Sequence, residues 1–127
     1  MRQLFLLDSI SSISPLQAGQ VIVSGSHGGV SAARFVVDAT DPPHAVFYND
    51  AGVGKDGAGI VGLDMLQAVG VIGAAYSHLS ARIGDAADGL ASGTLSHLNA
   101  HALGAGLRSG MTVQQAARLL NASYRNP

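Results

Sequence analysis

The chain contains no cysteine and no tryptophan, and it has few aromatic and few charged residues. Without cysteine it can form neither disulfides nor thiolate metal sites. Aromatic residues make up only 5% of the 127 residues, so no platform for stacking nucleic-acid bases is visible. Seven basic and eight acidic side chains give a net charge of −1, which provides no attraction to nucleic acid or to an anionic membrane. We therefore expect neither partner.

Long hydrophobic runs are also missing. No run approaches the roughly 20 apolar residues that a transmembrane helix needs. The apolar run Leu4–Leu7 stops at Asp8, which is too early for a secretory signal peptide. These features predict a cytoplasmic protein with no membrane association. Charged residues are only 12% of the chain and would cover little of a monomer's surface, so we also expect a homo-oligomer.

The length of 127 residues predicts a single domain that spans residues 1–127. We expect residues 1–19 to form an edge strand and a serine-rich connection, in which Pro15 opens a helical turn. Residues 121–127 are expected to form a frayed tail.

Three short hydrophobic runs predict strands over residues 20–24, 45–48 and 71–76. The first run is continuously β-branched, which is typical of a parallel strand that is covered on both faces. A strand that is half exposed would alternate apolar and polar residues instead.

Helical periodicity separates and follows these strands, over residues 30–39, about 60–70 and 94–107. Thr112 and Gln115 have the spacing of a capping box, which predicts the start of a last helix. Strands that alternate with helices predict an α/β fold. We expect a three-layer sandwich with a mostly parallel sheet of three to four strands, Rossmann-like or flavodoxin-like.

Polar pairs follow all three predicted strands. Ligands of open parallel sheets bind beyond the carboxyl ends of the strands, so these pairs are expected to meet at one edge. The pairs are Ser26 with His27, Asn49 with Asp50, and Ser77 with His78.

His27 and His78 are the candidate acid–base groups, and Asp50 is the candidate residue that orients a histidine. Lys55, the only lysine, and Arg82 are candidates for holding an anionic group of a substrate. The other candidate substrate-binding residues are Ser26, Gly28, Gly29, Asn49 and Ser77.

The segment GVGKDG at residues 52–57 has the spacing G-x-G-x-x-G of a dinucleotide site, but no acidic residue stands at a strand end about 20 residues later. It also fails as a phosphate-binding P-loop, because Asp56 replaces the Ser or Thr that holds magnesium. A bare anion site is the more plausible use of this loop. Asp56 is expected to cap the following helix.

No cofactor is firmly implied, although a divalent metal is possible. Its ligands would be His27, Asp50, His78 and His97. His97 and His101 are four residues apart, which would place them on one face of the helix expected over residues 94–107.

These residues predict an enzyme that acts on an anionic or amide-bearing metabolite by His/Asp acid–base chemistry, as a hydrolase, lyase or isomerase. The alternative is a non-catalytic small-molecule-binding or regulatory module.

Four segments resemble an uncharacterised family of small bacterial proteins. They are SGSHGG at 24–29, NDAGVGKDGAGI at 49–60, SHLSARIGD at 77–85 and SHLNA at 96–100. The resemblance attaches no activity, cofactor or catalytic residue to the chain. It implies only that these segments belong to one site.

Overall fold

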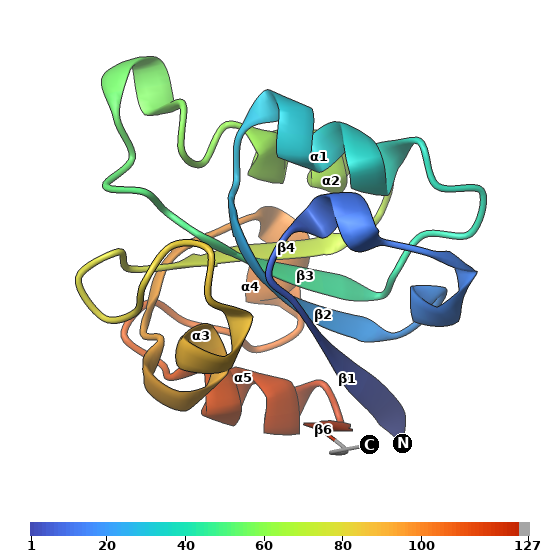
Figure 1. The fold of residues 1–127 in the computed structure, drawn as a ribbon. Coiled ribbons are helices and arrows are strands. Elements are labelled where there is room, and N and C mark those ends of the chain that lie inside the picture. The colour runs from blue at the N-terminus through green and yellow to red at the C-terminus, as the bar shows by residue number, and fades with distance from the viewer. Residues whose placement is uncertain (125–127) are drawn as a thin grey trace.

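The computed structural model describes residues 1–124, which form one sheet with helices packed on both of its faces (Figure 1). The strands are β1 (Arg2–Leu7), β2 (Val21–His27), β3 (Ala45–Asn49), β4 (Ile72–Tyr76), β5 (Leu95–Leu98) and β6 (Ala122–Tyr124). The helices are α1 (Val30–Val37), α2 (Gly62–Ala68), α3 (Ala86–Ser92), α4 (Ala100–Gly104) and α5 (Val113–Leu119). The short 3-10 turns are η1 (Ile10–Ser12), η2 (Pro15–Gln17) and η3 (Lys55–Gly57).

The sheet has the order β5-β4-β3-β2-β1-β6. Neighbouring strands pair in parallel, except that β5 pairs antiparallel with β4. The chain moves across the sheet in one direction from β1 to β4, and right-handed crossovers then place α1 and α2 on the same face. The return from β5 to β6 runs the other way, so α4 and α5 cover the opposite face.

Both faces of the sheet are buried, which explains the continuous β-branched run in β2. Val21 and Val23 belong to the core under α4 and α5, whereas Ile22 belongs to the core under α1 and α2. All three side chains are fully buried. The expected α/β fold with a mostly parallel sheet is therefore confirmed in outline.

The strand number and the two chain ends differ from the expectation. Residues 1–124 form six strands, not three to four. Strand β1 was expected at an edge, but it lies between β2 and β6. Part of the expected tail is that edge strand β6, because Ala122 pairs with Arg2; residues 125–127 lie outside the described residues.

The single helix expected over residues 94–107 is correct only for its middle part, residues 100–104. The segment forms strand β5 followed by α4, and Asn99 caps α4 by accepting a hydrogen bond from the amide of Ala102. Without β5, strand β4 would be an edge strand with unpaired backbone groups. Pairing with β5 gives these groups hydrogen-bond partners.

Helix α3 was not predicted. Asp56 does not cap α2, because it lies in η3 with a positive φ of 57° and α2 has no side-chain cap.

Two local predictions are confirmed. Pro15 opens the turn η2, and Thr112 and Gln115 form the capping box of α5. In residues 1–124, no helix has the length and apolar character that crossing a membrane requires.

Helix α2 contacts the turn after β2 at Gly62. A Cβ atom there would lie 2.6 Å from the carbonyl oxygen of Gly29, 2.7 Å from that of Gly28 and 2.8 Å from the Cβ of Ala33. The amide of Gly62 donates to the Gly28 carbonyl at 2.8 Å. Only glycine allows this approach, which ties α2 to the turn that follows His27.

We predict that Gly62→Ala lowers the free energy of unfolding by about 1–3 kcal/mol, because the added methyl group overpacks a backbone contact. Urea denaturation measures this change. Gly104→Ala is the matched control, because a Cβ atom at this helical glycine meets nothing within 4 Å. It should leave stability unchanged or raise it by up to about 1 kcal/mol. Equal responses of the two variants would contradict the contact.

Candidate functional site

The carboxyl ends of β2, β3 and β4 lie side by side, as the sequence predicted. In the ladder, His27 of β2 is opposite Asn49 of β3, and Asn49 is opposite Tyr76 of β4. The segments after β3 and β4 leave the same edge of the sheet in Figure 1. The three predicted polar pairs therefore reach one edge.

Asp50 is the most heavily bonded side chain at this edge. It is 4% exposed. Its Oδ1 accepts hydrogen bonds from the amides of Gly52 at 2.8 Å and His78 at 3.0 Å, and it lies 3.2 Å from Nδ1 of His78. Its Oδ2 accepts a hydrogen bond from the Ser96 hydroxyl at 2.7 Å. Both carboxylate oxygens are thus held.

Burial alone would raise the pKa of Asp50, because a carboxylate loses hydration inside a protein. The hydrogen bonds from Ser96, Gly52 and His78 outweigh burial and hold the pKa of Asp50 below its ordinary value of 3.8. Asp50 is therefore ionised at neutral pH. An ionised carboxylate can only accept, so Nδ1 of His78 donates to it.

His78 combines a fixed nitrogen with an accessible ring. Its side chain is 47% exposed. The ring lies over Gly52, where a Cβ atom would come within 3.4 Å of Cε1. When Nδ1 carries the proton that is donated to Asp50, a neutral imidazole presents its lone pair on Nε2. The sequence predicts that Asp50 orients a histidine but leaves open which one, and in the structure the contact is with His78.

Strand β5 adds two side chains to the site. Ala75 of β4 is opposite His97, but Tyr76 is opposite Leu95, so Ser96 is an extra residue in a β-bulge. The Ser96 hydroxyl lies 3.0 Å from Nδ1 of His97. Sequence reasoning missed Ser96 because it assigned this segment to a helix. The available signal was a third adjacent Ser-His pair after those at 26–27 and 77–78.

His27 lies at the same edge but in a different environment. It is exposed, and its Nδ1 accepts a hydrogen bond from the amide of Gly29 at 3.3 Å. It lines a cleft of about 380 Å³ together with Ser31, Phe35 and Gly84. Within residues 1–124, no hydrogen bond joins His27 to Asp50 or His78. The cleft that His27 lines and the hydrogen-bonded network around Asp50 share no residue.

Asn49 and Ser26 are used by the fold. The buried amide of Asn49 donates to the Ala81 carbonyl at 3.1 Å and accepts from the Ala51 amide at 2.8 Å. The Ser26 hydroxyl accepts from the Ile10 amide at 3.0 Å. Asn49, proposed from the sequence to bind substrate, instead anchors the loop that follows β4.

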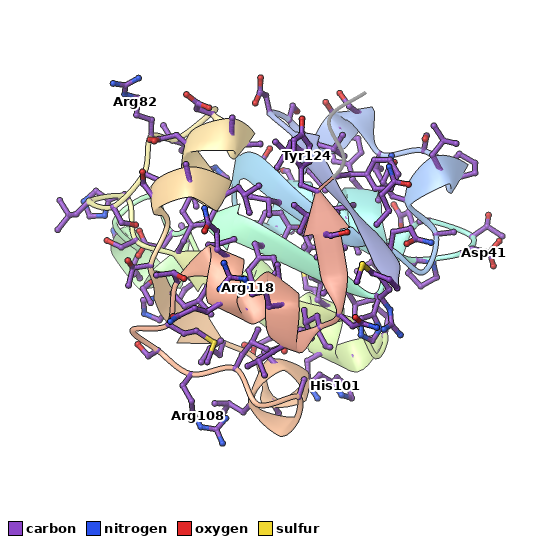
Figure 2. All side chains as sticks on the ribbon, turned by 90° about the horizontal axis from the view of Figure 1, so that it is seen from below. Asp41, Arg82, His101, Arg108, Arg118 and Tyr124 are labelled. Atoms are coloured by element: carbon purple, nitrogen blue, oxygen red, sulfur yellow. The ribbon has the colours of Figure 1, made fainter. Side chains whose placement is uncertain are left out.

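The other polar candidates lie at the periphery. The Ser77 hydroxyl accepts from the amide of Leu79 at 3.1 Å, as in a local turn. Arg82 is exposed, and its guanidinium projects away from the molecule in Figure 2. Only its backbone amide is bonded within residues 1–124, to Asp88 at 2.8 Å. Lys55 is exposed in η3. The structure therefore places neither cation against Asp50 or His78.

Several amides of the glycine-rich loop are bonded within the loop itself. The amides of Val53, Gly54 and Gly59 donate to carbonyls within the loop at 2.7, 2.8 and 2.6 Å. The amides of Gly28 and Gly29, also predicted to bind substrate, donate to the Asn49 carbonyl and the His27 ring. These bonds occupy the amides of Gly28 and Gly29, and a role of the two glycines in substrate binding stays a prediction.

The proposed set of metal ligands does not assemble. In residues 1–124, no group of three or more histidine and carboxylate side chains is placed to hold a metal ion. This removes the geometric support for His27, Asp50, His78 and His97 as a ligand set. His97 lies in β5, whereas His101, which Figure 2 labels, lies in α4, so the two histidines do not share a helical face.

Comparisons of this chain with protein-family models, with curated proteins and with solved structures found no match. The resemblance of its four motifs to a bacterial family stays a prediction. The geometry defines the class: an α/β domain with a histidine–aspartate pair at the carboxyl edge of a mostly parallel sheet.

We predict that Asp50→Asn lowers the free energy of unfolding at pH 7 by about 1–3 kcal/mol, because the amide cannot accept all the hydrogen bonds of the carboxylate. The pKa of folded Asp50 is below the unfolded value of 3.8, so its stabilisation is full above that pH. It is lost as the pH falls through the folded pKa.

The difference between wild type and Asp50→Asn should therefore narrow below pH 3.8 in urea denaturation between pH 7 and 3. Asp64→Asn changes an exposed carboxylate on α2 and serves as the control. If the difference in free energy of unfolding stays constant across this pH range, the hydrogen bonds do not lower the pKa of Asp50 in the folded protein.

Proposed function

We propose that this chain is a small-molecule enzyme in which His78, oriented by Asp50, moves a proton on an anionic or amide-bearing metabolite. The supporting observation is one arrangement: a buried carboxylate bound by four hydrogen-bond contacts, one of them to a half-exposed imidazole. Burial of an ionised group is unfavourable unless it is bonded, and titratable groups held by specific partners are frequent at functional sites.

The chemistry follows from the two nitrogens of His78. Nε2 accepts a proton from the substrate or from a water molecule, while Nδ1 keeps its proton and its bond to Asp50. The carboxylate remains ionised and stabilises the imidazolium that forms. His78 then returns the proton to a leaving group or to another atom of the substrate. Hydrolysis, elimination and isomerisation all begin with this transfer.

His27 and its cleft support binding of a substrate oxygen. Because Nδ1 of His27 accepts from Gly29, the neutral ring carries its proton on Nε2 and donates from there. The strand that carries His27 and the strand that precedes His78 are two spacings apart in the sheet, about 10 Å, which a small metabolite can span. A carboxylate or amide oxygen suits the donor on His27.

We predict that His78→Gln lowers turnover by about 10²–10⁴-fold, because glutamine cannot shuttle the proton. Proton NMR time courses on mixtures of small carboxylic acids and amides would first find a substrate and then compare variants. His101→Gln makes the same change at an exposed site on α4 and should leave turnover unchanged. Equal turnover by wild type and His78→Gln would end the proposal.

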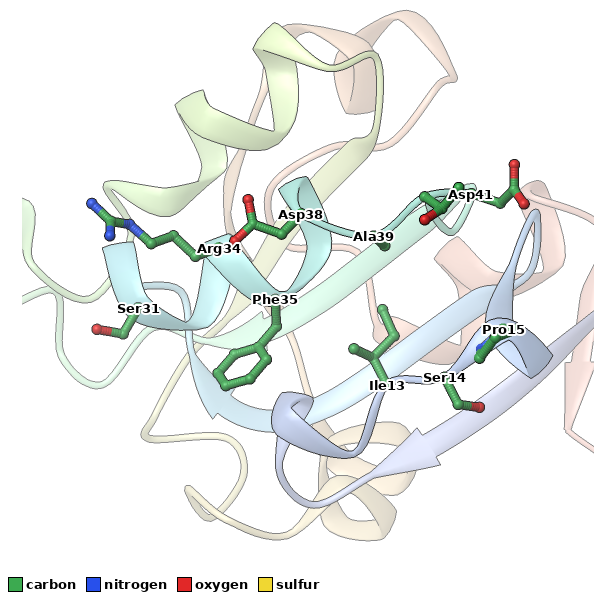
Figure 3. Close-up of a pocket in the computed structure, with 10 residues that line it drawn as sticks. Ile13, Ser14, Pro15, Ser31, Arg34, Phe35, Asp38, Ala39 and Asp41 are labelled. Carbon is green, nitrogen blue, oxygen red and sulfur yellow. The ribbon is translucent and has the colours of Figure 1, made fainter.

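A second candidate function, ligand binding without catalysis, is favoured by a larger groove. It has a volume of about 610 Å³ and lies between α1 and the connection from β1 to β2. Figure 3 shows Ile13 and Phe35 facing the space between these segments, and the charged side chains of Arg34 and Asp38 also line the groove. Ligand pockets typically have about 300–1,000 Å³ and apolar walls. Asp50 and His78 do not line this groove.

We predict that the groove binds 1-anilinonaphthalene-8-sulfonate, a fluorescent apolar probe, and that Phe35→Ser weakens this binding about tenfold because it removes an aromatic wall. Fluorescence titration measures the affinity. Leu119→Ser is the control, because Leu119 on α5 is 53% exposed and Phe35 is 45% exposed. Equal loss in both variants would show non-specific adsorption. Binding without any turnover of metabolites would favour the module over the enzyme.

A further inference from the structure

The bulge in β5 brings two neighbouring side chains together. Successive side chains of a regular strand point to opposite faces of the sheet, so adjacent serine and histidine side chains do not meet. In β5 the extra residue Ser96 breaks this alternation. As a result its hydroxyl lies 3.0 Å from Nδ1 of His97 and 2.7 Å from Oδ2 of Asp50.

The direction of these hydrogen bonds follows from counting protons. Ser96 has one hydroxyl proton and two candidate oxygen acceptors: Oδ2 of Asp50 at 2.7 Å and the carbonyl of Ala75 at 3.3 Å. The carboxylate is both closer and charged, so it receives the proton. Nδ1 of His97 must then donate to the Ser96 oxygen. His97 therefore donates to Ser96, and both Ser96 and His78 donate to Asp50.

We infer that Ser96 and His97 are positioning residues for the Asp50–His78 pair. Ser96 holds the carboxylate oxygen that His78 does not contact, which stops the carboxylate from rotating out of line with the imidazole. His97 holds the serine hydroxyl toward Asp50 and away from the Ala75 carbonyl. This inference rests on the proposed function of His78, and it adds a second histidine that the reaction does not protonate.

The direct test is the protonation of ring nitrogens, read by NMR of protein labelled with nitrogen-15 in histidine. In the wild type at a pH where the rings are neutral, His78 and His97 should carry the proton on Nδ1, and His27 should carry it on Nε2. A proton on Nε2 of neutral His97 would overturn the inference without any variant. His27 is the internal control for the assignment.

Variants of Ser96 test the link to His78. Ser96→Ala should make the Nδ1 proton of His78 exchange faster with water and should lower kcat about tenfold or more at unchanged KM, because the carboxylate is less well aligned. Ser96→Thr retains the hydroxyl and should restore both. An unchanged exchange rate and kcat in Ser96→Ala would overturn the inference.

Two outcomes separate this inference from the proposed function. If His78→Gln abolishes turnover while Ser96→Ala changes neither exchange nor kcat, the function stands and the inference falls. If Ser96→Ala speeds exchange of the His78 proton but His78→Gln leaves turnover intact, the hydrogen-bonded unit stands and the catalytic role of His78 falls.

Discussion

The site depends on the cost of burying one negative charge. Asp50 is nearly inaccessible, and an isolated carboxylate in such a place would take up a proton rather than stay ionised. The fold meets this cost with donors from three separate segments: Gly52 after β3, His78 after β4 and Ser96 in β5. The same bonds that keep Asp50 charged also fix the ring of His78 and attach the edge strand β5. The hydrogen bonds of Asp50 therefore hold the strand and orient the histidine at the same time.

Irregular pairing on both sides of a regular pair of strands shapes this edge. Strands β3 and β4 pair without interruption over their whole length. The outer neighbours do not: in β2 the register shifts between Val23 and His27, and in β5 it shifts at Ser96. Bulges bend a strand and turn its side chains, so each neighbour presents an adjacent serine and histidine near the carboxyl ends of the central pair. The serine and histidine side chains of β2 and β5 thus lie where the strand pairing is irregular.

The sequence predicted the parts of the molecule that depend on local pattern. The β-branched run before Ser24 marked a strand buried on both faces, and parallel topology predicted that Asp50 and His78 reach the same edge of the sheet, although not that they touch. Residues 95–98 were misassigned because their apolar spacing fits a helix, whereas in the structure they pair with the edge of β4 as a strand. The role of Asn49 was also beyond the sequence, since no pattern shows whether a side-chain amide is bonded within the protein.

With the extra residue in β5, regular backbone pairing with β4 and contact between adjacent side chains exclude each other. A strand one residue shorter at this point would continue the ladder without a break and would pair every backbone group with β4. It would also return adjacent side chains to opposite faces, where a serine and the next histidine could not bond to each other. The extra residue therefore gives up regular pairing with β4 and makes the contact between Ser96 and His97 possible.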